Sequence, residues 1–137
     1  MGISGQVDAL KTILATGMPP ALVTAGLPAL DEYVMGGPTD SGRKSLGVYM
    51  GPWDESPDRQ GFRPVVQLAL PGVSYPDGLK VLEVLIGQLK IVDPSALDCT
   101  NLENISCTEF PPDEDSATIF TLYLEYSAER DDCDGWR

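Results

Sequence analysis

Residues 62–92 read FRPVVQLALPGVSYPDGLKVLEVLIGQLKIV and contain the two clearest predicted elements of the chain. Residues 62–70 are almost continuously apolar, which is typical of a buried central strand, and Pro64 suits the first residues of such a strand. Pro76 and Asp77 suit a first helical turn, and the apolar residues that follow form a broad apolar face. The stretch therefore predicts a central strand and then a helix that covers a sheet.

Three further strands are predicted around this stretch. Leu46, Val48 and Met50 alternate with Gly47 and Tyr49, which predicts a strand. A polar loop over residues 51–61 joins this strand to the central strand, so the two strands are most simply antiparallel. Residues 104–110 and 118–127 form the last pair, joined by a turn at residues 111–115. In the final strand, Phe120, Leu122, Leu124 and Tyr126 share one face, whereas Thr121 and Glu125 lie on the other.

An amphipathic helix is predicted before the strands. Apolar residues recur at helical spacing over residues 5–15, and Gly17 followed by Pro19 and Pro20 predicts the end of this helix. Residues 21–44 contain short apolar pieces broken by glycine and proline. They predict an irregular excursion with room for one short strand.

The resulting order is α-β-β-α-β-β, which predicts the α+β fold class: an antiparallel sheet of about four strands packed with two helices. Residues 1–137 are predicted to form a single domain. Its charged end, residues 129–137, is predicted to be a loose acidic tail. The hydrophobic content of 42% is enough for one core without disulfides.

The charge balance excludes several classes of partner. Nine Lys and Arg residues stand against 21 Asp and Glu residues, a net charge of −12, and the cations form no stripe. Because nucleic-acid grooves depend on Lys and Arg, a nucleic-acid groove is not expected. The same field would repel an anionic membrane, and no signal peptide or membrane-spanning stretch is visible. The three cysteines suit free thiols in a reducing cytoplasm.

The residue inventory argues against an enzyme. The chain has no histidine, which removes Ser-His-Asp and Cys-His catalysis and every zinc site that needs His. Residues 37–45 come near a phosphate-binding P-loop, but Arg43 stands where the motif needs Lys, and Lys44 comes one place late. A strand also follows where the motif needs a helix, so a turn is the better interpretation. We expect no catalytic residues, no metal and no cofactor.

Two groups of residues are candidates for binding. Trp is enriched at protein interfaces, and a tryptophan in a polar loop has no obvious core role, although it could equally fold back on the sheet edge. The candidate subunit or partner interface is Trp53, Asp54, Glu55 and Arg59. The second group is Asp113, Glu114 and Asp115, which form either a solvated hairpin turn or part of an acidic lumen, and which could also bind a divalent ion weakly.

The order and spacing of these elements resemble the tail terminator proteins of long-tailed, lambda-like bacteriophages. The likeness covers about residues 4–128, and related head-tail joining proteins share much of the pattern. Its landmarks are a strand ending in Val48-Tyr49-Met50, a strand running into Ala69-Leu70-Pro71, a helix opening with Pro76-Asp77, a turn at Pro112-Asp113-Glu114-Asp115 and a final strand reading Leu122-Tyr123-Leu124-Glu125-Tyr126.

The resemblance implies a structural virion protein in the tail or neck, assembled in the host cytoplasm. Such proteins form a homo-oligomeric ring, a hexamer, at the head-proximal end of the tail tube. The ring stops tube polymerisation and joins the tail to the head connector, so the implied partners are the tail tube protein and the head-tail connector protein. A ring that closes needs two different complementary patches on each subunit. DNA would pass through the lumen without specific binding, since carboxylates repel phosphates.

Two other interpretations remain open. One is a small cytoplasmic α+β module that binds a ligand or protein without forming a ring, with a pocket flanked by the apolar central strands. The other is a small enzyme that uses carboxylates and a divalent metal, which the missing histidine disfavours. Oligomeric state separates the ring from the binding module.

Overall fold

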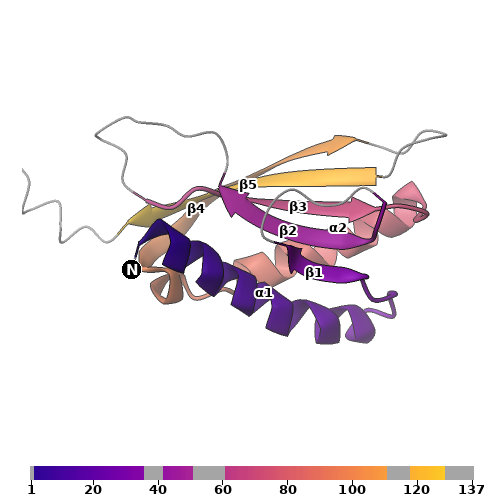
Figure 1. Cartoon of the computed structure of the whole chain (residues 1–137), viewed down its shortest axis with the longest axis horizontal. Helices are drawn as coiled ribbons and strands as arrows, with labels where there is room; N and C mark the ends of the chain where they lie inside the picture. The colour runs from indigo at the N-terminus through magenta and orange to yellow at the C-terminus, as the bar shows by residue number, and fades with distance from the viewer. Residues whose placement is uncertain (1, 36–41, 51–60, 111–117, 129–137) are drawn as a thin grey trace, which may run out of the picture.

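The structure, a computed structural model, describes residues 2–35, 42–50, 61–110 and 118–128. These residues form two layers (Figure 1). One layer consists of helices, and the other is a five-stranded sheet. The helices are α1 (Ile3–Thr24), α2 (Tyr75–Lys90) and the short 3-10 helix η1 (Pro94–Leu97), and the strands are β1 (Glu32–Met35), β2 (Ser45–Met50), β3 (Pro64–Leu70), β4 (Cys99–Phe110) and β5 (Thr118–Ala128). The predicted α+β class is confirmed.

The strands lie in the order β1-β2-β3-β5-β4. β3 is central, as its apolar sequence predicts, and the β2–β3, β3–β5 and β4–β5 pairs are antiparallel. β1 pairs with β2 in parallel, so the prediction of about four antiparallel strands is wrong in detail: the sheet is mixed and has a fifth strand. β1 is only four residues long, and its place depends on a contact with a distant residue, because the amides of Asp31 and Glu32 donate to the carbonyl of Lys44.

The core lies between the helices and one face of the sheet. Direct pairing aligns Leu46, Leu68 and Phe120 in one row across β2, β3 and β5, and Val48, Val66 and Leu122 in the next. All six side chains belong to one buried cluster with α1 and α2. Figure 1 shows both helices on the same side of the sheet. The predicted apolar face of the last strand is thus the face that packs on the helices.

α1 is longer than the sequence predicts. The prediction ended it near residue 15, yet it runs to Thr24 with Pro19 and Pro20 inside it. Each interior proline costs about 3 kcal/mol relative to alanine. The helix continues because an apolar residue recurs at every fourth position and stays fully buried on both sides of the prolines: Leu10, Leu14, Met18 and Leu22. Burying each such side chain contributes about 1.5–3 kcal/mol, which offsets the local penalty.

α2 begins as its sequence predicts. The hydroxyl oxygen of the N-cap residue Ser74 accepts a hydrogen bond from the Asp77 amide at 3.3 Å, and the Asp77 carboxylate lies in the first turn. A negative charge there complements the helix dipole. β4 begins five residues before its predicted start, because two register irregularities near its beginning interrupt the alternation that marks a strand.

Two helical glycines provide a matched test of the contact between α1 and α2. A Cβ atom on Gly87 would meet nothing within 4 Å, whereas a Cβ on Gly17 would meet the Gln88 side-chain oxygen. We therefore expect Gly87→Ala to raise the free energy of unfolding by about 0.5–1 kcal/mol. Gly17→Ala should raise it by less, because Gln88 must rotate away. Urea unfolding of both variants checks this ordering, and a larger gain at Gly17 would contradict the described packing.

Candidate functional site

The residues predicted to form the binding site lie outside the described part of the chain. This holds for Trp53, Asp54, Glu55 and Arg59, and for Asp113, Glu114 and Asp115. It also holds for the predicted tail at residues 129–137. Their predicted roles stay predictions, and the structure bears on them only through the residues at the borders of these segments.

The described residues that border the two candidate segments lie at opposite ends of strand β3. Residues 51–60 follow Met50, which pairs with Pro64 at the start of β3. Residues 111–117 precede Thr118, which pairs with Leu70 at the end of β3. β3 has seven residues, and at roughly 3.3 Å per residue its two ends lie about 20 Å apart. The chain thus joins one candidate segment to each end of β3, as two separate surfaces would require.

The sheet face opposite the helices is described over four strands. Direct pairing forms one row from Tyr49 through Val65 and Tyr123 to Ser106, which runs across β2, β3, β5 and β4. A second row contains Gln67, whose side-chain amide donates to the Thr121 hydroxyl at 3.1 Å. None of the helices in the described residues packs on this face, yet its exposure is uneven: Val65 and Thr121 are buried, whereas Tyr123 is 43% exposed. We call it the open face.

The open face combines aromatic groups with a lack of cations. Tyr123 is 43% exposed although it lies in the middle of a strand. Burial, and then the nearby Tyr123 phenol, raise the pKa of Tyr49 above its ordinary value, so the Tyr49 hydroxyl is neutral at physiological pH. The regularly paired positions of β2, β3, β4 and β5 on this face include no Lys or Arg and one carboxylate, Glu125. Glu32 of β1 pairs with Ser45 on the same face, and Arg63 lies just before β3. Such a surface can contact a partner protein but offers nothing for phosphate recognition.

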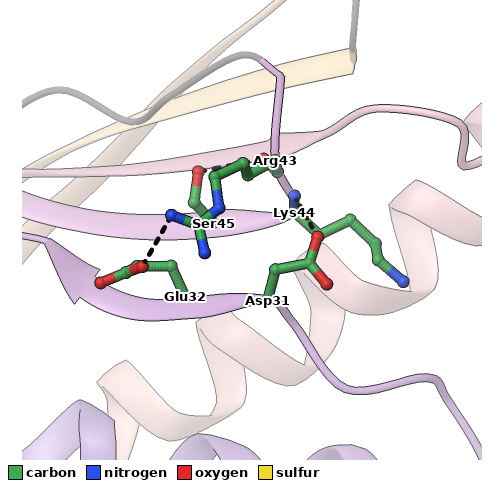
Figure 2. A network of polar contacts seen from close by, with 5 residues as sticks. All are labelled: Asp31, Glu32, Arg43, Lys44 and Ser45. Carbon is green, nitrogen blue, oxygen red and sulfur yellow. Dashed lines mark hydrogen bonds and ion pairs between the residues drawn. The ribbon is translucent and has the colours of Figure 1, made fainter.

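The end of the near-P-loop segment has a structural role. Figure 2 shows Arg43 and Glu32 reaching toward each other, with the Arg43 guanidinium 3.2 Å from the Glu32 carboxylate. The Lys44 amide donates to the Asp31 carboxylate at 3.0 Å, and Ser45 begins strand β2 rather than a helix. These contacts hold β1 beside β2. The prediction that a strand follows this segment is confirmed.

A small pocket of about 450 Å³ lies where α1 ends and α2 begins. Lys44 and Lys80 line it, together with Ser74 and Asp77 at the start of α2. The Lys80 ammonium lies 3.8 Å from the Asp77 carboxylate, so one of the two cations is already paired. The lining thus combines two ammonium groups with one carboxylate. It lies away from the central strands, where the binding-module interpretation expected a pocket.

The described residues contain no candidate metal site. They contain no group of three or more His, Cys, Asp or Glu residues that could hold a metal ion. Cys99 is buried and Cys107 is exposed. The described helices include none with the length and apolar character needed to cross a membrane.

Comparison with known proteins adds no relative: no protein-family model, curated protein or solved structure matches the chain.

Proposed function

We propose that this chain is a non-enzymatic structural subunit of a bacteriophage tail terminator ring, or of a closely related head-tail joining ring. In this role six copies close on the head-proximal end of the tail tube, stop its polymerisation and present a docking surface to the head connector. The partners are other copies of the chain, the tail tube protein and the connector protein, and the location is the tail or neck of the virion.

The observation that carries the proposal is the one-sided packing of the sheet. Both helices cover one face, and the open face presents a half-exposed tyrosine in the middle of β5. A two-layer subunit of this kind has a second sheet face available for assembly. The lack of Lys and Arg in the strands of that face suits a surface past which DNA slides, because it offers no cation to the phosphates.

Two further features support a ring. The candidate segments around Trp53 and around Glu114 are joined in the chain to opposite ends of β3, and head-to-tail closure requires two different surfaces. The net charge of −12 suits a lumen that repels DNA.

Charge reversal in the loop tests the proposed assembly. We expect Asp54→Lys with Glu55→Lys to reduce the ring fraction at least about tenfold, because like charges placed in an interface cost several kcal/mol. The measurement is solution mass by light scattering, with circular dichroism to show that the fold is intact. The matched control is Asp8→Lys with Glu83→Lys, which changes the net charge equally at exposed helical positions outside the loop sequence.

The control pair should leave the ring fraction unchanged. If both double variants reduce assembly equally, net charge controls assembly and the loop has no special role. If neither does so and both fold, the loop is not an interface.

A monomeric binding module is the second candidate, and the pocket beside Lys44 and Lys80 favours it. In that case a small anion such as citrate or phosphate would raise the thermal midpoint, and Lys44→Ala with Lys80→Ala would remove the rise. The ring proposal expects no such rise at millimolar anion concentrations.

A further inference from the structure

β4 is an unusually long strand at the edge of the sheet. It has twelve residues, whereas strands most often have about five or six. In the sheet order it has β5 on one side and no strand of the described residues on the other. An edge strand presents a row of backbone donors and acceptors that can pair with another chain.

The pairing register shows where those backbone groups point. The Phe62 and Tyr126 backbones exchange two hydrogen bonds, so Tyr126 directs its amide and carbonyl toward the β3 side. Leu124, two residues earlier, has the same orientation. Ile105 lies opposite Leu124 and therefore directs its amide and carbonyl away from β5, toward the outer edge. From Asn104 to Phe110 the register is regular, so this part of the edge is straight.

The opposite edge of the sheet is poorly suited to pairing. β1 has four residues, its register with β2 shifts between Glu32 and Met35, and Val34 adopts a positive φ of 52°. A short, interrupted strand is one of the ways in which proteins protect an edge. β4 has no proline and no lysine to do the same.

A groove runs beside the β4 edge. It has a volume of about 510 Å³ and lies between β4 and the segment that follows α2. Apolar side chains from both sides line it: Val92, Pro94, Leu102 and Ile105, together with Lys90 and with polar β4 residues. A strand edge beside an apolar groove is the arrangement by which proteins bind extended peptides, since the edge supplies main-chain hydrogen bonds and the groove accepts alternate side chains.

The charges indicate the partner's chemistry. Both charged residues of β4 are glutamates, Glu103 and Glu109, and Glu103 is exposed at the groove, which Lys90 at the end of α2 also lines. A second copy of this chain would bring the same glutamates to the contact, and like charges brought together across a strand pair disfavour self-pairing at this edge. A partner strand with Lys or Arg opposite Glu103 would instead be attracted.

We propose that the β4 edge binds an extended segment of a different protein, in which apolar residues alternate with Lys or Arg. The segment adds a strand beside Ile105 and inserts an apolar side chain between Val92 and Leu102. This inference does not depend on the ring.

The probe for the test is an amidated peptide of sequence TKVTVKVTK, titrated into the full-length ¹⁵N-labelled protein. We expect the peptide to change the NMR chemical shift of the Ile105 amide. Hydrogen exchange of that amide should slow at least tenfold. Ile105→Pro removes the outward donor without removing a bond to β5, and Ile105→Ala loses a similar side chain but keeps the donor. Binding should weaken about tenfold more in the proline variant than in the alanine variant. Glu103→Lys should weaken it several-fold at low salt.

Several outcomes would overturn the proposal. The first is that the proline and alanine variants bind the peptide with equal affinity. The second is that millimolar peptide leaves the hydrogen exchange of the Ile105 amide in the wild-type protein unchanged. The third is that the proline variant loses self-association but binds the peptide normally. The last result would make β4 a contact between copies. If the proline variant does not fold, the exchange measurement on the wild-type protein decides alone.

Discussion

Phe120→Ala is expected to lower the free energy of unfolding by about 3–5 kcal/mol, because the ring is fully buried and its removal leaves a cavity. Phe120 lies under the helix layer, where its ring centroid is 6.4 Å from that of Tyr75 on α2 and its edge approaches Gly78. Urea unfolding followed by circular dichroism measures the change.

The control for this variant lies three residues further along the same strand. Tyr123 is 43% exposed on the open face, so Tyr123→Ala should cost less than about 1 kcal/mol. The contrast between the two positions tests the one-sided packing of the sheet. Equal losses at Phe120 and Tyr123 would mean that the open face is covered as fully as the helical face, and the described architecture would be wrong.

Tyr126→Phe is expected to raise the free energy of unfolding by about 1 kcal/mol near neutral pH. The Tyr126 hydroxyl is buried and has no hydrogen-bond partner among the described residues, so folding removes it from water without replacing that bond. The stacked contact with Phe62, at 6.0 Å between ring centroids, is retained by phenylalanine. The matched control is Tyr33→Phe, which should have the opposite sign, because the Tyr33 hydroxyl accepts a hydrogen bond from the Leu30 amide at 3.1 Å.

Alkaline pH should enlarge the difference at Tyr126. Burial, and then the nearby Cys99 thiol, raise the pKa of Tyr126 to about 12, whereas an unfolded tyrosine ionises near 10. The stability linked to this raised pKa is fully present below about pH 10 and is lost as the pH rises through about 12. Between those values the wild-type protein should lose about 2 kcal/mol more than Tyr126→Phe. Parallel pH profiles of the two proteins would contradict the burial of this hydroxyl.

The sequence predicts the central strand and the second helix well because their signals are local. The apolar run of β3 and the capped, amphipathic start of α2 contain most of what determines them. The alternation in β5 also predicts which face packs on the helices, since Phe120 is buried in the core and Thr121 lies on the open face.

The errors arise where distant contacts outweigh local preferences. Pro19 and Pro20 predict the end of a helix, yet α1 continues because Met18 and Leu22 are buried against other elements. β1 has little strand character of its own and forms because its neighbours bond to Lys44. The open face was foreseeable only in part, from Thr121 and Glu125, because whether a second layer covers a sheet depends on the whole topology.

The candidate interface stays a sequence-based prediction. Trp53 and its neighbours, and the acidic turn at residues 113–115, lie outside the described residues, so their roles depend on the resemblance and on solution experiments.

The most direct test of the central claim is the mass of the assembled protein. Light scattering over rising concentration, repeated with purified tail tubes and followed by negative-stain imaging, should reveal a uniform ring of six times the 14.7 kDa chain, about 88 kDa. A ring that forms alone, or that closes only on tube ends, is the predicted result. A chain that stays monomeric at every concentration and does not bind the tube ends would contradict the ring and leave the binding module as the better account.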